Sequence, residues 1–433
     1  MSEDSQLILI DQVKIGMYIK LDLSWFEHSF PMNSFKIVSQ QQLQELRALN
    51  LKHVRYIPSK SDQLAQPVSA KSDPENSNSK PSLPENAVVF SSILEAKKAR
   101  FEKLQQQRDE IRRCEEKFVK AAAVVKNINK LIFSRPKETI AEAIKLTNNI
   151  AEVFTSSNDT VMHLIQQTGA NEELYFHTLN VSVLSMMLAH QMKCTESQIK
   201  DVGLAALFHD LGKVNLPESI TNKLGPLNKH EQNFFELHPH YGVELGIKAG
   251  LSKLVLDVIA QHHEFSDGTG YPAKLKGEAI SYPARIVALA NAYDNLCNHN
   301  DPRLSLTPHE ALSNLYAHRR MQFDARAIAT LVKSLGVYPP GTLVKLSNEA
   351  IGLVMNVNVG NPLRPRVLVY DAEIPKDDAI ILDLDEESKD LNISASIRPG
   401  LIPKPVFDYL SPRKRINYYF DSQSKQTQNS PKG

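Results

Sequence analysis

The sequence predicts a mainly α-helical protein with a small α/β module before the helical part and a small β module after it. Residues 136–335 run as successive helical segments without convincing strand alternation. Residues 7–57 alternate like strands around Gly16 and continue as a short helix and a further strand. From near Tyr338 apolar and polar residues alternate again, between glycines typical of turns. We therefore expect a helical domain flanked by two small strand-containing modules.

Length and composition limit the class of protein. A chain of 433 residues is expected to form about two to four domains. Its formal net charge of +1 provides no overall field that would attract a nucleic acid or an acidic membrane surface. No apolar run approaches the roughly 18 residues of a membrane span, and the first residues lack the features of a secretory signal. The cysteines at 114, 194 and 297 form no ligand-like pattern, so we expect a cytoplasmic protein with reduced thiols.

Changes in composition indicate where the parts of the chain begin and end. Residues 58–86 are rich in Ser, Pro and Asn and nearly free of large apolar residues, which is typical of a disordered linker. The charged stretch that follows fits either a helix packed on its own domain or a coiled-coil contact in a homodimer. We expect an N-terminal module at 1–66, a disordered linker at 67–90, a long charged helix at 91–135, a helical domain at 136–335, a β-rich module at 336–410 and a polar tail at 411–433.

Histidines and carboxylates are concentrated in the helical domain. His209 and Asp210 end an apolar helix in the segment ALFHDLGK, where a buried carboxylate needs a partner. Glu173 and His177 are four residues apart and so lie on one face of a helix, where both can contact one ion. Further candidates at helix ends or on apolar helices are His238, His262, His263 and Asn291.

This set predicts a centre with more than one metal ion. A single His beside an Asp is usually only a hydrogen-bonded polar pair. The prediction of a metal site therefore depends on the presence of the other candidate ligands. They are too many for one ion, and a set without thiolates favours Fe, Mn or another borderline-hard ion over structural zinc. Two cations sharing Asp210 would lower the pKa of a bridging water towards neutrality and so provide a hydroxide nucleophile.

The segments FHDLGKVNLP and HHEFSDGTGYP together resemble the HD-GYP phosphodiesterases, a subgroup of the HD superfamily. His209 and Asp210 match the naming pair, and Gly270, Tyr271 and Pro272 match the naming triplet. The resemblance covers the predicted helical domain, and the flanking modules resemble those of the branch with a DUF3391 domain. It implies an all-helical bundle that hydrolyses the bacterial second messenger cyclic di-GMP to linear pGpG, and often on to GMP, with two or three iron or manganese ions.

The resemblance also implies roles for single residues. It implies metal ligands, with Asp210 as the bridge, at Glu173, His177, His209, Asp210, His238, His262 and His263. Lys213 matches a lysine placed to meet the scissile phosphate or the leaving oxygen, and Tyr271 lies where the family contacts its ligand. Asp294, one helical turn after Asn291, is expected to orient a ligand or to contact the substrate.

Two segments depart from the family pattern. Asn291 stands where the family usually has a ligand Asp, and its amide oxygen can coordinate but carries no charge. The arginines of the family's RPYR segment, which hold phosphate, are replaced by NDPR, where only Arg303 matches. Besides a cyclic di-GMP phosphodiesterase, a weak or inactive cyclic dinucleotide sensor, a protein-interaction module and a hydrolase of another cyclic dinucleotide therefore stay open.

Overall fold

The computed structural model describes most of the chain in two compact units. The described residues are 5–23, 28, 30, 33–49, 51–62, 86–156, 160–165, 173–223, 225–299, 301–358, 361–372, 374–376, 379–410 and 416–422. At the start of some helices, the first two residues of α4 (Glu173–Gln191) among them, only the backbone is described. Unit 1 takes its residues from Met1–Asp109, Leu343–Val354 and Leu363–Pro412, and unit 2 takes the rest.

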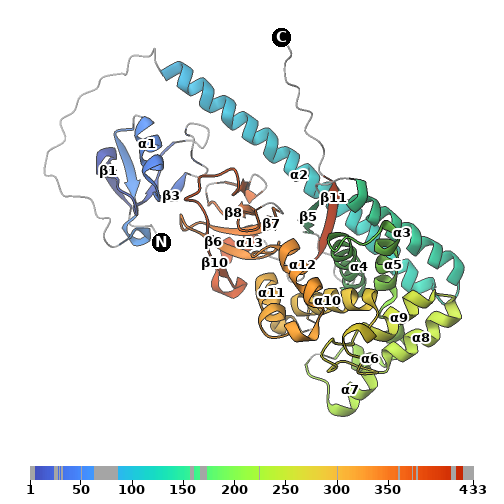
Figure 1. Ribbon diagram of the computed structural model, residues 1–433. Coiled ribbons are helices and arrows are strands. Elements are labelled where there is room, and N and C mark those ends of the chain that lie inside the picture. Colours follow the sequence, from blue (N-terminus) through green and yellow to red (C-terminus); the bar gives the residue numbers. More distant parts are fainter. Residues whose placement is uncertain are drawn as a thin grey trace, which may run out of the picture. The chain divides into compact units, whose positions relative to one another are not determined.

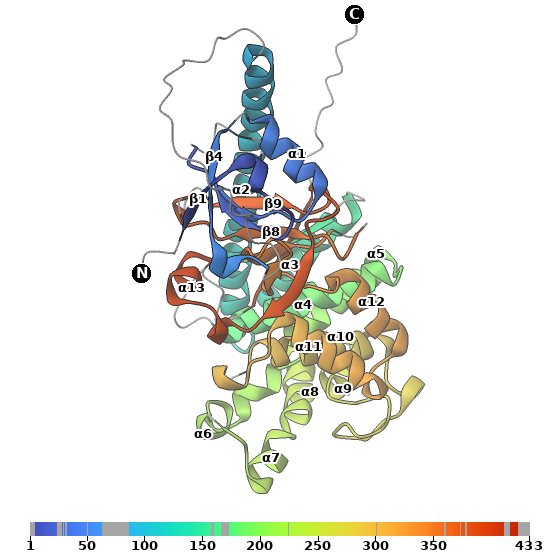
Figure 2. The ribbon, with the colours of Figure 1, turned by 90° about the vertical axis from the view of Figure 1, so that its left-hand side faces the viewer.

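Unit 1 contains a four-stranded antiparallel sheet with the strand order β1-β4-β2-β3. Its elements are β1 (Gln6–Leu9), β2 (Tyr18–Lys20), β3 (Ser34–Lys36), α1 (Gln40–Ala48) and β4 (His53–Tyr56). Figure 2 shows α1 alongside the sheet. Alternate strand residues such as Ile19 and Phe35 are buried, because successive side chains of a strand point to opposite faces. The predicted small α/β module is confirmed.

A second sheet of unit 1 has five strands in the order β10-β6-β7-β8-β9. Its elements are β6 (Leu343–Leu346), β7 (Ile351–Asn356), β8 (Arg366–Val369), β9 (Ile380–Asp383) and β10 (Ile393–Ile397), followed by α13 (Lys404–Leu410). Lys36 of β3 forms ion pairs with Asp62 at 2.9 Å and with Glu349, in the turn after β6, at 3.4 Å. The modules predicted at the two ends of the sequence therefore belong to one compact unit.

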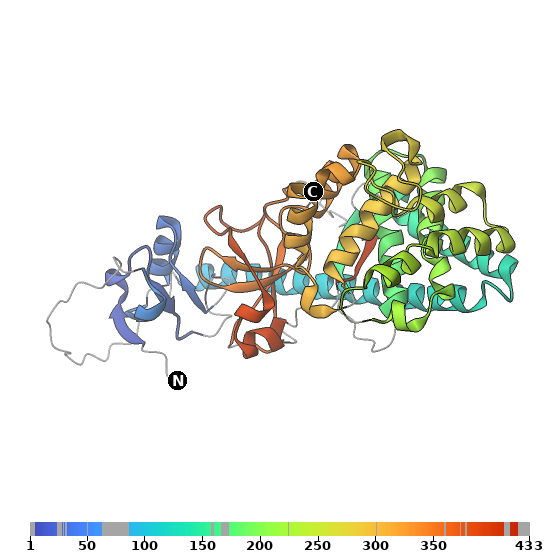
Figure 3. The same ribbon diagram turned by 90° about the horizontal axis from the view of Figure 1, so that it is seen from below.

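Unit 2 is a bundle of helices, which confirms the predicted mainly α fold. The helices after the long α2 are α3 (Pro136–Ser156), α4 (Glu173–Gln191), α5 (Glu196–Phe208), α6 (Glu218–Thr221), α7 (Lys229–Phe235), α8 (His238–Ala249), α9 (Lys253–Gln261), α10 (Tyr282–Cys297), α11 (Pro308–Ala317) and α12 (Ala325–Leu335). Helix α4 contacts α3, α5, α10 and α12, and Figure 3 shows the ribbon from below. Its residues are buried on all sides, with Val181, Leu184 and Leu188 at 0% exposure, as expected of a central helix.

The long helix α2 (Asn86–Leu131) begins before the predicted residue 91, since residues 86–90 include no helix breaker. Residues 63–85, most of the predicted linker, lie outside the described residues. The second half of α2 packs inside unit 2, where the ring of Phe118 lies 5.3 Å from that of Phe176 and 6.0 Å from that of Tyr419. This half is packed on its own domain, whereas pairing of two chains through α2 stays a prediction.

No helix in the described ranges is long and apolar enough to cross a bilayer.

A two-stranded antiparallel sheet joins β5 (Thr160–Leu164) to β11 (Tyr418–Ser422) beside α3 and α4 (Figure 1). The mainly helical domain at 136–335 therefore also contains the short strand β5. The prediction that residues 416–422 belong to a polar tail is wrong, because residues 418–422 form β11. Tyr418 is only 1% exposed, and its hydroxyl lies 3.0 Å from that of Tyr293 and donates to the carbonyl of Pro340 at 3.1 Å. The five strand residues are too few to stand out between polar flanks, so this packing is visible only in the fold.

Candidate metal centre

Three buried histidines at helix ends in unit 2 share one hydrogen-bond pattern. In each of them Nδ1 lies within hydrogen-bond distance of the backbone carbonyl three residues earlier: His209 with Ala206 at 2.7 Å, His238 with Phe235 at 2.8 Å and His262 with Ile259 at 2.8 Å. A carbonyl oxygen can only accept, so Nδ1 carries the proton. The Nε2 atom of each neutral ring is therefore left as a lone-pair donor, which is the form that binds metals.

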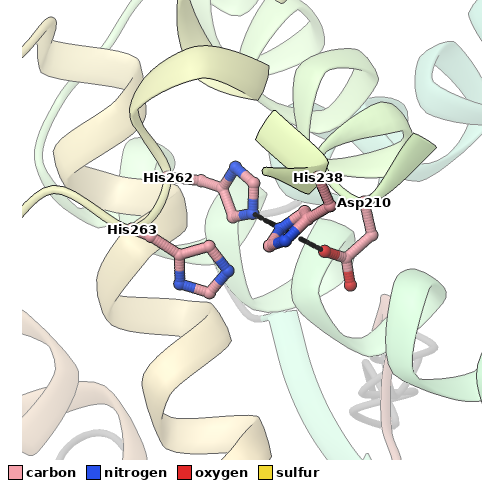
Figure 4. Close-up of side chains that lie close together, drawn as sticks. All are labelled: Asp210, His238, His262 and His263. Carbon is pink, nitrogen blue, oxygen red and sulfur yellow. Dashed lines mark hydrogen bonds and ion pairs between the residues drawn. The ribbon is translucent and has the colours of Figure 1, made fainter. Parts of the chain in front are cut away.

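The carboxylate of Asp210 lies between the Nε2 atoms of these rings. Its Oδ1 is 3.5 Å from Nε2 of both His238 and His262, and these two nitrogens are 3.2 Å apart. Its Oδ2 is 3.2 Å from Nε2 of His209 and 3.5 Å from Nε2 of His177. Figure 4 shows Asp210, His238 and His262 converging, with His263 beside them. Asp210 thus faces a different set of imidazoles with each of its two oxygens.

These side chains form two overlapping groups that share Asp210. In each group, one potential ligand atom per residue lies within 4.8 Å of the others. The first group is Asp210, His238, His262 and His263, and the second is His177, His209 and Asp210. Among the described residues, four buried atoms of these groups have no hydrogen-bond partner: Nε2 of His177, Nε2 of His209, Oδ1 of Asp210 and Nε2 of His263. Such atoms are costly to bury unless something else binds them.

The spacing of the atoms fits coordination of divalent ions. Two ligand atoms each about 2.1 Å from one ion lie about 3.0 Å apart at a right angle and about 3.4 Å apart at the tetrahedral angle. The separations of 3.2 Å between the nitrogens of His238 and His262, and of 3.5 Å from each to Asp210, are close to these values. The unpartnered atoms and the donor set therefore fit metal ions.

His177 differs from the other histidines because a carboxylate holds its Nδ1. This atom lies 2.6 Å from Oδ2 of Asp294, on α10. Burial disfavours the charged ring, but Asp210 and Asp294 outweigh it and raise the pKa of His177 to about 9. Asp294 is 2% exposed and both its oxygens accept hydrogen bonds from other side chains, whereas a contact between Asp294 and the substrate stays a prediction. Its position fits the other expected role, that of orienting a ligand.

Burial and neighbouring charges also shift the pKa values of His209, His238, His263 and Asp210. Burial lowers the pKa of His209, lowers that of His238 to about 3, and lowers that of His263 well below the usual range of a histidine. For Asp210 burial acts in the opposite direction, but His209 and Lys213 outweigh it and hold the pKa of this carboxyl well below its usual value. At neutral pH these residues are neutral imidazoles and a carboxylate, the forms in which they bind metal ions.

We expect the metal-free protein to become less stable as the pH falls below about 6.5. The unfolded chain protonates its histidines near pH 6.5, whereas the folded state keeps His209, His238 and His263 neutral to lower pH. The unfolded state then binds more protons, and the free energy of unfolding falls by on the order of several kcal/mol down to about pH 4. His177, with its raised pKa, contributes stability that is present below pH 6.5 and is lost as the pH rises through about 9.

Denaturant unfolding of EDTA-treated protein between pH 4 and 9 measures both effects. The variant His263→Gln removes one of the neutral rings and should show a shallower fall on the acid side. Equal stability of the metal-free protein at pH 4.5 and 6.5 would contradict this assignment.

A glycine contact holds Asp210 beside His238. A Cβ atom at Gly212 would lie 1.9 Å from the carbonyl oxygen of His238 and 2.4 Å from the backbone nitrogen of Gly242. The short helix η4 (Leu211–Asn215) therefore contacts the start of α8 only because residue 212 has no side chain. The close approach brings the end of α5 and the start of α8 to the same point.

We expect Gly212→Ala to lower the free energy of unfolding by about 3 kcal/mol or more, because the methyl group meets backbone atoms that cannot move aside. Gly400→Ala is the control, since its Cβ would meet no atom within 4 Å; it should change stability by less than about 0.5 kcal/mol. Urea unfolding of both variants measures the difference. Equal midpoints would show that η4 can shift without cost.

The Gly-Tyr-Pro loop folds back over His263. The ring of Tyr271 stacks on the imidazole, with 4.6 Å between ring centroids and 17° between planes, and burial raises the pKa of its phenol. A Cβ at Gly270 would lie 2.4 Å from the carbonyl oxygen of His263, so the return of the chain requires glycine. The Glu264 carboxylate accepts hydrogen bonds from the backbone N–H groups of Ala273 at 2.6 Å and Leu275 at 2.9 Å. The loop therefore holds Tyr271 against the cluster.

The remaining predicted residues lie in different surroundings. Lys213 donates to Oδ2 of Asp210 at 2.6 Å and its side chain is 25% exposed, so it joins the cluster and can be reached by a ligand. Asn291 is buried, and its Oδ1 accepts from Asn295 at 2.7 Å. Arg303 is 84% exposed and donates to Asp301 through Nε and Nη2, an interaction that occupies its guanidinium. The side chain of Glu173 lies outside the described residues.

Sequence reasoning missed two buried asparagines. Oδ1 of Asp294 accepts a hydrogen bond from Asn180 at 2.6 Å and from Asn298 at 2.9 Å. The sequence signal that could have found these asparagines is their spacing. Asn180 lies one helical turn after His177, and Asn298 lies one helical turn after Asp294. An asparagine on a buried helix carries no chemistry of its own, so this spacing alone did not point to the site.

Comparisons with known proteins identify the family. The HD domain family matches residues 89–327, more than half of the chain, and a domain of unknown function, DUF3391, matches residues 5–143. A cyclic di-GMP phosphodiesterase of Pseudomonas aeruginosa is 30% identical over 84% of this chain and 84% of its own length. The cyclic di-GMP phosphodiesterase response regulator RpfG of Xanthomonas campestris is 36% identical over 35% of this chain and 41% of its own length. A solved HDG"Y"P protein from Bdellovibrio bacteriovorus has 17% identity and a TM-score of 0.41 over 76% of this chain and 98% of that one.

The helical unit and its histidine–aspartate cluster define a metal-dependent phosphohydrolase of the HD type. The chain belongs to the HD-GYP phosphodiesterases that carry an N-terminal DUF3391 domain.

Proposed function

We propose that this protein hydrolyses cyclic di-GMP to linear pGpG, with GMP as a further product. The observation that carries the proposal is the position of Asp210, whose two oxygens face two separate sets of buried imidazoles. A carboxylate shared in this way is the arrangement that two-metal phosphoesterases use to hold a pair of ions. The cyclic di-GMP phosphodiesterase of Pseudomonas aeruginosa, similar over most of its length, supports the choice of substrate.

We propose that the centre holds two or three ions of Fe or Mn. Imidazole and carboxylate ligands without thiolate suit these metals. The proposed ligands are His177, His209, Asp210, His238, His262 and His263, with Glu173, one turn before His177 on α4, and the amide oxygen of Asn291 as further ligands. Bound ions of this kind polarise a phosphoryl oxygen and activate a water molecule at neutral pH.

The other proposed residues act on the phosphate and the bases. Lys213 is partly exposed beside Asp210, so its ammonium group can contact the scissile phosphate and stabilise negative charge on the leaving oxygen. Tyr271, held against His263, offers an aromatic edge and a protonated hydroxyl to a ligand at the cluster. Arg303 would have to break its ion pair with Asp301 before it could bind a phosphate, so it is a weaker phosphate contact than Lys213.

The alternative to cyclic di-GMP is a different substrate, a cyclic dinucleotide with one adenine base. A 3'3'-cGAMP-specific phosphodiesterase of Vibrio cholerae is 30% identical over 43% of this chain and 36% of its own length. Bound metal ions would act on the phosphodiester and would not distinguish the bases, so the proposed metal site does not by itself choose between the two substrates.

We also propose a cytoplasmic location, in keeping with cysteines at 114, 194 and 297 that form no ligand-like or disulfide-framework pattern in the sequence.

The deciding experiment is a substrate panel on protein loaded with Fe²⁺ or Mn²⁺ without oxygen. Cyclic di-GMP and 3'3'-cGAMP are incubated separately, and the products are separated by chromatography. We expect conversion of cyclic di-GMP to pGpG that EDTA abolishes. A loaded protein that binds cyclic di-GMP but leaves it intact over hours would overturn the proposal in favour of a sensor, and faster turnover of 3'3'-cGAMP would reassign the substrate.

A further inference from the structure

A buried hydrogen-bond network connects His177 to the C-terminal strand β11. Oδ2 of Asp294 holds Nδ1 of His177 at 2.6 Å. Oδ1 of the same carboxylate accepts from Nδ2 of Asn180 at 2.6 Å and of Asn298 at 2.9 Å. Asp294, Asn180 and Asn298 are 2%, 0% and 7% exposed, so protein groups rather than solvent set their orientation.

The other hydrogen bonds of both asparagines go to the backbone just before and within β11. Oδ1 of Asn180 accepts from the N–H of Tyr418 at 2.8 Å, and Oδ1 of Asn298 accepts from the N–H of Ile416 at 2.6 Å. Both Nδ2 groups also donate to the carbonyl of Ile416, at 2.7 and 2.8 Å. A side-chain amide has one acceptor oxygen and two N–H donors. The N–H groups of the strand thus turn each oxygen toward the strand and each Nδ2 toward Asp294.

The strand that orients these amides is itself firmly held in unit 2. It pairs with β5 along its length, and the N–H of Ile165 donates to the carbonyl of Asn417 at 2.9 Å. The buried hydroxyl of Tyr418 contacts Tyr293 on α10, the helix that carries Asp294. The segment lies beyond residues 89–327, the part of the chain matched by the HD domain family.

We propose that residues 416–418 complete the metal centre, with Asn180 and Asn298 as positioning residues for His177. The backbone of this segment orients the two amides, the amides orient Asp294, and Asp294 turns Nε2 of His177 toward Asp210. Without the segment, either amide can rotate and place its oxygen against the carboxylate, which would repel it. The inference rests on the proposed metal site, but it concerns the binding of the ion and not the substrate.

Asn180→Asp tests this connection with almost no change in shape. The new aspartate keeps one oxygen as the acceptor for the N–H of Tyr418. Its second oxygen then faces two acceptors, the Asp294 carboxylate and the Ile416 carbonyl. Ser182→Ala is the matched control, because it removes a buried hydrogen bond of the same helix, to the carbonyl of Gly203, and leaves the network intact. Mn²⁺ titration, followed by the electron paramagnetic resonance signal of the free ion, measures affinity and stoichiometry. Thermal unfolding of the metal-free proteins measures the structural effect.

We expect Asn180→Asp to weaken Mn²⁺ binding at the His177 group by about 10- to 100-fold, and Ser182→Ala to bind Mn²⁺ like the natural protein. Asn298→Ala removes one donor to Asp294 and keeps Asn180 in place, so it should weaken Mn²⁺ binding by about 10-fold. If Asn180→Asp does not fold, Asn298→Ala tests the inference in its place. Normal Mn²⁺ binding by a folded Asn180 or Asn298 variant, or an equal loss in Ser182→Ala, would overturn the inference. Absence of cyclic di-GMP hydrolysis by the natural protein would instead overturn the proposed function and leave these binding results unaffected.

Discussion

Asp210→Asn is expected to remove bound metal from both groups and to reduce hydrolysis of cyclic di-GMP by more than about 10³-fold. The substitution keeps the shape of the side chain and removes the negative charge that both sets of imidazoles face. If two ions share this carboxylate as proposed, its loss would affect every step that depends on them. Metal content per chain, measured by elemental analysis, and turnover of the loaded protein check this result.

Asp257→Asn is the control for this prediction. Asp257 lies on α9 near the cluster in sequence, but it pairs with the exposed Lys253 at 2.6 Å. Its substitution should leave metal content and turnover unchanged, because exposed ion pairs contribute little. Two ions per chain in a folded Asp210→Asn protein would rule out the shared carboxylate as the centre of the site.

Lys213→Met should lower kcat by about 10²- to 10³-fold while metal remains bound. The ammonium group of Lys213 lies 2.6 Å from Oδ2 of Asp210 and 5.5 Å from the centroid of the Phe235 ring, and it has no lone pair for a metal. In the role proposed above, it stabilises charge that develops on the phosphate or the leaving oxygen, and removing one such group typically has an effect of this size. Because Lys213 also competes with cations for Asp210, metal affinity should stay equal or rise.

Lys200→Met is the matched variant for Lys213. Lys200 is on α5, the helix that ends at the HD pair, and it pairs with Glu196 one turn away at 2.5 Å. We expect no change in kcat, metal content or KM for this variant. If Lys213→Met loses its metal, the lysine has a structural role at Asp210 and not a catalytic one; if its kcat is unchanged, the lysine has neither role.

The sequence was sufficient to predict the fold class and the residue types of the cluster. The helical period of residues 136–335 and the strand-like alternation at the two flanks reflect local rules, because a side chain's face follows from the repeat of its own element. His209, Asp210, His262 and His263 lie next to glycines or helix ends that are visible in the sequence. These local signals explain why the sequence alone predicts these residues as candidate metal ligands.

The roles of Arg303, Asp294 and the C-terminal segment could not be predicted in the same way. Arg303 is occupied by Asp301, two residues away, although its position suggested a phosphate contact. From the sequence Asp294 was equally suited to contact a substrate or to orient a ligand, and its burial against His177 favours the second role. Residues 416–422 looked like a tail because their partners, β5 and two asparagines, lie more than a hundred residues away in sequence.

The sequence by itself determined the helical class of residues 136–335, the strand-like alternation of the flanks, and that imidazoles and carboxylates stand near helix ends. Only the tertiary structure decided that Asp210 faces two sets of imidazoles at once, and that Asn180 and Asn298 connect His177 to the last strand. The physical reason is the distance along the chain over which each kind of interaction acts. Helical periodicity and capping act over a few residues, whereas a shared carboxylate or a buried amide network exists only after distant segments have packed to within a few ångströms of one another.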